Sequence, residues 1–186
     1  MTVTVTPTEF HFVRYDAAVV ERITLDLLDR LGMTGRDVLV DIDEATPLIG
    51  MALVSSDPIT LKIEGGALEN PKALRTLSKV NVANAIGRLL LHARDRAGPF
   101  TDAPPDGQLT LAQRAAWETY SNGRLERLGY DSHRSRWLYH FRSRHGFTDA
   151  VDAAFERLWN AENLSWSELS TLSRSLTDAA ASVPER

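Results

Sequence analysis

Residues 37–64 read DVLVDIDEATPLIGMALVSSDPITLKIE, and this stretch decides the fold class. Short runs rich in β-branched and apolar residues alternate in it with turn residues, a pattern that predicts strands. The three strands we expect cover residues 37–43, 48–54 and 59–64. Because only short turns join them, at residues 44–47 and at Asp57-Pro58, we expect antiparallel pairing.

Helical patterns flank this stretch on both sides. Asp16 is a candidate N-cap for a helix that runs to about Leu31, before Gly32, and residues 10–13 are expected to form a short strand ahead of it. Asn70-Pro71 is expected to open a long central helix, with asparagine as the cap and proline at the tolerated first position. This helix should end before Gly98-Pro99.

The second half of the chain has only helical patterns. Thr110 with Gln113 and Ser165 with Glu168 have the spacing of capping boxes, and Thr148 or Asp149 can cap another helix between them. The sequence therefore predicts an α+β protein: a small, mainly antiparallel sheet packed on a long central helix, followed by an all-helical C-terminal half. We expect residues 1–97 to form the α+β half, 98–108 a loop or linker, and 109–186 the helical half, packed on the first as one globular unit.

Composition excludes several classes of function. The chain has 186 residues and no cysteine, which rules out disulfides, a thiolate nucleophile and cysteine-based metal sites. It has no run of about 18 apolar residues that could span a bilayer, and no secretion signal at its start, so we expect a cytoplasmic protein without a membrane partner. Its net charge of -4 is unfavourable for a general nucleic-acid binder.

The order of the elements from residue 16 to residue 97 resembles that of the small zincin-like metallopeptidase domains. The matching pieces are a helix, a strand that ends in acidic residues and a proline, two further strands and a long helix. In that family the long helix carries a His-Glu-x-x-His motif, in which two histidines bind zinc and the glutamate activates a metal-bound water.

The ligands of that motif are missing here. If His92 is placed on the second histidine, Arg88 takes the place of the first and Leu89 that of the glutamate. An arginine has no lone pair to donate to zinc. The resemblance thus implies a scaffold that has lost its metal and the hydrolytic reaction, and we expect no cofactor. A histidine near the end of a helix is also commonly a half-buried or surface residue, favoured by the helix dipole.

One segment, residues 124–145, stands out by its charge. It holds six of the eighteen arginines and three of the five histidines, with Trp137, Tyr139 and Phe141 among them. The segment carries +4 with neutral histidines, which leaves -8 for the rest of the chain. The candidate anion-binding residues in it are Arg134, Arg136, His140, Arg142, Arg144 and His145.

Two interpretations of this segment remain open. Guanidinium groups match phosphate and carboxylate geometry, and the aromatic rings could stack on bases. Alternatively the aromatic residues are core and the arginines pair with the carboxylates of an acidic protein. The sequence does not decide whether the segment is a helix, a strand or a loop.

The leading hypothesis is a metal-free, non-catalytic, zincin-like scaffold with a binding or interaction role, its partner an unknown protein or a small anionic ligand. The alternative is anion binding by residues 124–145, with nucleic acid or a nucleotide as a less favoured partner. A third hypothesis, an enzyme that uses arginine and histidine of this segment, requires His140 or His145 within hydrogen-bond reach of a carboxylate. Aromatic helices in a small protein are also compatible with a dimer.

Overall fold

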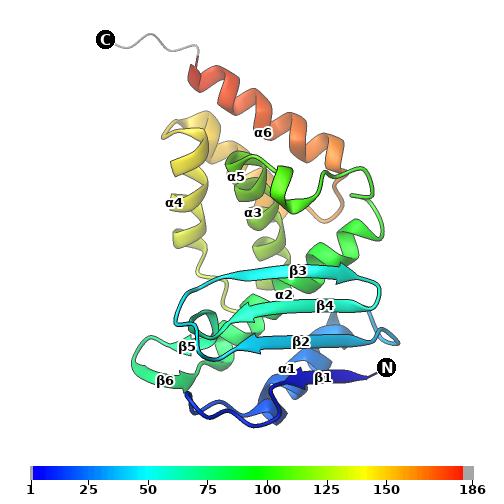
Figure 1. The fold of residues 1–186 in the computed structure, drawn as a ribbon. Helices are drawn as coiled ribbons and strands as arrows, with labels where there is room; N and C mark the ends of the chain where they lie inside the picture. The colour runs from blue at the N-terminus through cyan, green and yellow to red at the C-terminus, as the bar shows by residue number, and fades with distance from the viewer. Residues whose placement is uncertain (1, 182–186) are drawn as a thin grey trace. The chain divides into compact units, whose positions relative to one another are not determined.

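The computed structural model describes residues 2–181 (Figure 1). The chain divides into two compact units, one that ends at Ala97 and one that begins at Gly98. The first unit contains the strands that the structure describes, and the second is helical. The α+β class expected from the sequence is confirmed.

Six strands and three helical segments make up the described part of the first unit. The strands are Val3–Thr6 (β1), Val38–Asp43 (β2), Met51–Ser56 (β3), Ile59–Glu64 (β4), Glu69–Asn70 (β5) and Ala73–Leu77 (β6). The helical segments are Ala17–Arg30 (α1), Gly65–Leu68 (η1, a 3-10 helix) and Lys79–Arg96 (α2).

The main sheet is mixed, whereas antiparallel pairing was expected. Its strand order is β1-β2-β4-β3, with β2 parallel to both β1 and β4, and β3 antiparallel to β4. Helix α1 connects β1 to β2 and so permits their parallel pairing, and the tight turn at Asp57-Pro58 makes β3 and β4 a hairpin. This hairpin places β4, not β3, beside β2. A separate antiparallel pair is formed by β5 and β6.

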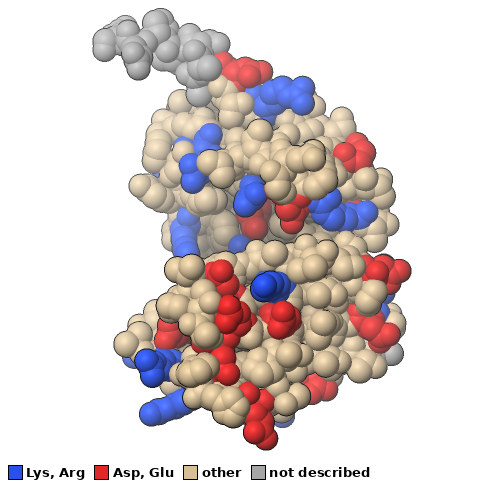
Figure 2. Space-filling view, viewed as in Figure 1, with Lys and Arg blue, Asp and Glu red and all other residues tan. Residues whose placement is uncertain are grey.

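Alternation along the strands separates a buried face of the sheet from a polar one. In β2, Val38, Val40 and Ile42 are buried, while the residues between them are exposed or partly exposed. Helices α1 and α2 pack on the buried face and lie behind the sheet in Figure 1. Acidic side chains gather around a basic one on the face of the sheet turned to the viewer (Figure 2). On β2 and β4, Asp41 is in register with Lys62.

Two expected elements of the first unit are wrong. Residues 10–13 are not a strand, because the backbone N–H groups of His11 and Phe12 donate to the Glu44 carboxylate, and the first strand is β1 instead. Asn70-Pro71 does not open the long helix: it forms the turn between β5 and β6, where the Asn70 side chain accepts from Lys72 N. Helix α2 begins only after Ser78, whose hydroxyl caps the N–H of Asn81.

The second unit is built from four α-helices and a short 3-10 turn within the described residues. They are Asp106–Gln108 (η2), Leu111–Arg127 (α3), Arg134–His145 (α4), Asp149–Asn160 (α5) and Trp166–Ala181 (α6). Both expected capping boxes are present, Thr110 with Gln113 and Ser165 with Glu168, and Thr148 caps α5. Residues 182–186 of the predicted helical half lie outside the described part.

Aromatic rings dominate the core of the second unit. Phe100, Trp117 and Trp166 contact one another with ring centroids 5.0 to 5.8 Å apart, and Phe141, Phe155 and Trp159 continue this cluster. No described helix combines the length and the apolar character needed to cross a membrane.

Candidate functional site

The degenerate motif positions lie on α2. Arg88 donates from Nε to the carbonyl of Asn84 and from Nη2 to the sulfur of Met51 on β3, at 3.2 and 3.0 Å. Leu89 and His92 are buried. Arg88 therefore packs against the sheet, and within residues 2–181 no three His, Cys, Asp or Glu side chains gather in a group that could hold a metal ion.

Four of the six arginines in the 124–145 segment are held by structural contacts inside the second unit. Arg124 is buried with its guanidinium 3.7 Å from the centre of the Tyr120 ring. Arg127 donates to the carbonyl groups of Trp159 and Ala161 at the C-terminal end of α5, and Arg134 pairs with Glu156. Arg142 forms a two-point pair with the Asp152 carboxylate, with 2.7 Å between Nε and Oδ1. Arg134 and Arg142 thus pair with carboxylates, as the structural interpretation expects, whereas Arg124 and Arg127 contact an aromatic ring and backbone carbonyl groups.

The Arg142 pair also shifts the pKa values of its two groups. Hydrogen bonding to Arg142 holds the pKa of the Asp152 carboxyl below its usual range, and hydrogen bonding to Asp152 raises the pKa of Arg142. Both side chains are partly exposed, so water screens the pair. The pair joins α4 to α5 and leaves neither charge available for a ligand.

His145 is a structural residue in the core of the second unit. Its side chain is 2% exposed, and its ring stacks on Phe141 with centroids 4.1 Å apart. Nδ1 lies 3.1 Å from the carbonyl oxygen of Phe141, and Nε2 lies 3.0 Å from the hydroxyl of Ser173. Burial lowers the pKa of His145, and the neutral ring satisfies both contacts by donating from Nδ1 and accepting at Nε2.

The three remaining candidate anion-binding residues of the segment lie on one face of α4. Arg136, His140 and Arg144 follow at intervals of four residues, next to the exposed Tyr139. The guanidinium groups of Arg136 and Arg144 form no ion pair or hydrogen bond with residues 2–181. Tyr139 stacks edge-on with the exposed Phe147, with centroids 6.0 Å apart. We call Arg136, Tyr139, His140 and Arg144 the α4 face.

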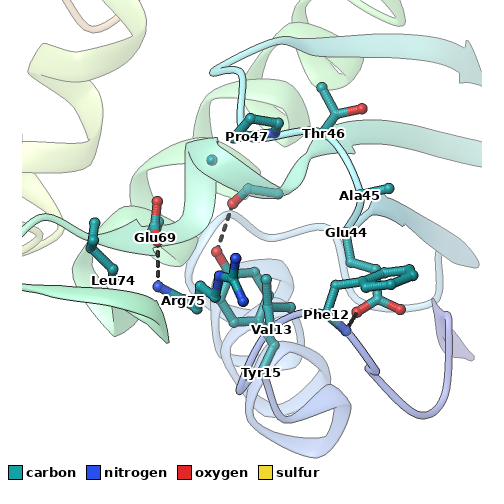
Figure 3. Close-up of a pocket in the computed structure, with 12 residues that line it drawn as sticks. Phe12, Val13, Tyr15, Glu44, Ala45, Thr46, Pro47, Glu69, Leu74 and Arg75 are labelled. Atoms are coloured by element: carbon teal, nitrogen blue, oxygen red, sulfur yellow. Dashed lines mark hydrogen bonds between the residues drawn. The ribbon is translucent and has the colours of Figure 1, made fainter.

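A pocket of about 480 Å³ lies in the first unit, away from every candidate position named from the sequence. Four segments form it: the chain before α1, the β2–β3 connection, η1 and the β5–β6 hairpin (Figure 3). Its lining is Phe12, Val13, Tyr15, Glu44, Ala45, Thr46, Pro47, Gly65, Gly66, Glu69, Leu74 and Arg75. The volume falls within the range of about 300 to 1,000 Å³ that is usual for small-molecule sites.

Hydrogen bonds fix the walls of the pocket. Glu44 Oε2 accepts from the backbone N–H groups of His11 and Phe12 at 2.8 and 2.7 Å and so ties the chain before α1 to the β2–β3 connection. The hydroxyl of Tyr15 donates to the carbonyl of Gly65 at 2.7 Å. Burial, with a smaller effect of the nearby Glu69 charge, raises the pKa of Tyr15 to about 12, so this hydroxyl stays protonated at neutral pH.

Gly66 allows η1 to approach the β2–β3 connection closely. A Cβ at this position would lie 2.6 Å from the carbonyl carbon of Pro47 and 2.5 Å from the oxygen of Leu48. Glycine is therefore the only residue that fits this backbone contact. Gly66 and Pro47, which meet in this contact, both line the pocket.

Arg75 occupies an unusual backbone conformation beside the pocket. Its φ of 59° lies in the left-handed region, which costs a non-glycine residue about 1 to 2 kcal/mol. Two bonds hold it there: its N–H donates to Glu69 Oε1, and its carbonyl accepts from the N–H of Arg14 at 2.7 Å. The Arg75 side chain reaches back toward Val13 and Tyr15 (Figure 3).

Sequence reasoning missed this site. The long helix expected from Asn70-Pro71 onward would contain Arg75, which lies instead in β6. The one available signal was local: Asn70-Pro71-Lys72 is also a turn sequence, and that alternative would have placed a hairpin at the edge of the sheet.

Comparison of the chain with protein-family models, with curated proteins and with solved structures found no match in any of the three.

Proposed function

We propose that this protein is a metal-free, non-catalytic binding protein of zincin-like element order that takes its ligand in the pocket of its first unit. The observation that carries the proposal is the pocket itself, a concave and mostly apolar surface held in shape by Glu44, Tyr15 and Gly66. Concave apolar sites with a few fixed polar groups are the usual form of ligand sites.

Side chains on α2 support a binding role over hydrolysis. Arg88 and Leu89 stand where the zincin-like motif has a histidine and a glutamate, and Arg88 is turned to Met51. A zinc-dependent reaction needs ligand lone pairs and a base, which arginine and leucine do not supply. We therefore propose that the function lies at the pocket. A cytoplasmic location is part of the same proposal.

Amide chemical shifts of the full chain, titrated with a library of small apolar acids, amines and amides, test this proposal. We expect shifts confined to residues 12–15, 44–47 and 65–75. Ala45→Trp, which fills the pocket from an exposed lining position, should abolish them.

Ala18→Trp is the matched control, because Ala18 is exposed on α1 and does not line the pocket. This variant should bind like the parent chain. Shifts that centre on residues 84–96, or that persist in Ala45→Trp, would contradict the proposal. Stoichiometric zinc in the purified protein, lost on His92→Ala, would contradict its metal-free character.

A second candidate function, anion binding, is favoured by one observation, the α4 face. Arg136 and Arg144 are exposed and form no ion pair with the described residues, and exposed Tyr139 lies between them along the helix. Unpaired guanidinium groups beside an aromatic ring suit the backbone and a base of a single-stranded nucleic acid.

Filter binding of a single-stranded oligonucleotide at low salt tests this second function. Arg136→Ala with Arg144→Ala should weaken binding about tenfold and reduce its salt slope by roughly 1.4, at about 0.7 per phosphate contact. Arg157→Ala, an exposed arginine on α5, is the control. Equal affinity and slope in the double variant would exclude the α4 face as an anion site.

A further inference from the structure

The lining of the pocket combines an exposed apolar rim with one cationic group. Phe12 and Leu74 are 65% and 81% exposed and both line the pocket, so they present apolar surface that a ligand in the pocket would cover. Arg75 also lines the pocket, and its guanidinium forms no ion pair or hydrogen bond within the described chain. A ligand that fits should therefore pair apolar bulk with a negative charge.

The charges of the lining limit how negative that ligand can be. Glu44 accepts two backbone N–H bonds and Glu69 accepts one, so both carboxylates already have donors. In contrast, the guanidinium of Arg75, the cation of the lining, forms no hydrogen bond or ion pair with residues 2–181. With Glu44, Glu69 and Arg75 the lining carries a formal charge of -1, so it repels a phosphate dianion more strongly than a monocarboxylate.

The backbone of Arg75 supplies an independent argument. A non-glycine residue in the left-handed region, held by Glu69 on its N–H and by Arg14 on its carbonyl, directs its side chain toward Val13 and Tyr15 (Figure 3). It sits where the β5–β6 register shifts, and such irregularities commonly redirect a side chain next to a functional site. The left-handed backbone conformation of Arg75 thus costs conformational energy and directs its guanidinium toward the pocket.

We infer that the ligand of this pocket is an apolar monocarboxylate whose carboxylate pairs with Arg75 while its apolar group packs against Phe12, Val13 and Leu74. The inference rests on the proposed function, since it names the ligand class of the same pocket. Two sources present this chemistry: the C-terminal residue of a peptide and a free apolar carboxylic acid. The planar guanidinium suits the two oxygens of either.

Calorimetric titration of the full chain with matched probes tests the inference. N-acetyl-leucine carries the carboxylate, N-acetyl-leucinamide has a neutral amide in its place, and leucinamide has that amide together with a free α-amine in place of the acetamide. A tripeptide that ends in leucine, compared with N-acetyl-leucine, separates the two sources. We expect the two acids to bind about three- to tenfold more tightly than either amide, a modest factor because Arg75 is exposed.

Substitutions at Arg75 test whether its side chain causes the tighter binding of the acids. Arg75→Gly removes the guanidinium at a φ that glycine adopts freely, so the fold should persist while the preference for acids is lost. Arg75→Lys keeps the positive charge and should therefore retain part of the preference for acids. Lys72→Ala, an exposed cation of the same hairpin outside the lining, should change nothing.

The outcomes separate the inference from the function on which it rests. Amides that bind as tightly as the acids would overturn the carboxylate assignment and leave a pocket that binds neutral or cationic ligands. A preference for acids that survives Arg75→Gly would overturn the pairing of the carboxylate with Arg75. No pocket shift with any member of the library would overturn the proposed function itself.

Discussion

The arginines of this chain make different kinds of contact, and the residues adjacent to each in the sequence do not indicate which kind. Arg142 donates two hydrogen bonds to the Asp152 carboxylate, and Arg124 is buried over the Tyr120 ring. Arg136 has no ion pair within the described residues. Charge counting identified the 124–145 segment but could not separate these cases, because the partners of Arg134 and Arg142 are on α5. The sequence likewise contains no indication of the positive φ of Arg75.

At the residue scale, His145 should make stability depend on pH. Its pKa is lowered in the folded state, so the unfolded chain binds the proton more readily and folding is weakened by acid. The contribution is present above about pH 6.5, the ordinary histidine value, and is lost as the pH falls through the folded pKa. One group can add at most about 1.4 kcal/mol per pH unit to this slope.

Urea unfolding of the parent chain and of His145→Gln at pH 8 and pH 5.5 measures this effect. We expect the free energy of unfolding of the parent to fall more steeply with acid than that of His145→Gln, which keeps a polar group but does not titrate. His11→Gln, at an exposed histidine, is the control and should retain the steep slope. Identical slopes in the parent and His145→Gln would show that His145 is not the group responsible.

At the element scale, the local signals were sufficient for most helices and insufficient for the sheet. Helices α1, α3, α5 and α6 begin at N-cap residues that can be recognised from the neighbouring sequence, as with Thr110 and Gln113. Strand pairing is non-local, and nothing adjacent to β4 indicates that it lies between β2 and β3. Asn70-Pro71 fits a helix start and a hairpin turn equally well, and the pairing of β5 with β6 decided between them.

The crossing of α3 and α5 depends on Gly123. A Cβ there would lie 2.7 and 2.8 Å from the carbonyl carbon and Cα of Trp159, which are backbone atoms that cannot move aside easily. Gly123→Ala should lower the free energy of unfolding by about 1 to 3 kcal/mol, even though alanine is the better helix former by about 1 kcal/mol. Thermal and urea unfolding of the full chain provide the measurement.

Gly107→Ala is the matched control for this substitution, since a Cβ at Gly107 meets nothing within 4 Å and the residue lies in the same unit. It should leave stability nearly unchanged. A Gly123→Ala chain as stable as the parent would mean that α3 and α5 can separate without loss.

At the scale of the whole molecule, the pocket depends on segments that are far apart in the sequence. Phe12, Glu44, Gly66 and Arg75 meet only because the sheet and its hairpin bring their segments together. They lie in loops, a short 3-10 helix and an irregular strand, where sequence patterns carry the least information about position. The fold class was therefore predictable from residues 37–64, and the candidate site was not.

The most direct measurement of the central claim is a crystal structure of the full chain soaked with the tightest-binding member of the ligand library. The account predicts electron density for the ligand in the pocket of the first unit, in contact with Phe12 and Leu74 and with a carboxylate at the Arg75 guanidinium. Ligand density beside Arg88 and His92 on α2, or a metal ion held there, would contradict it.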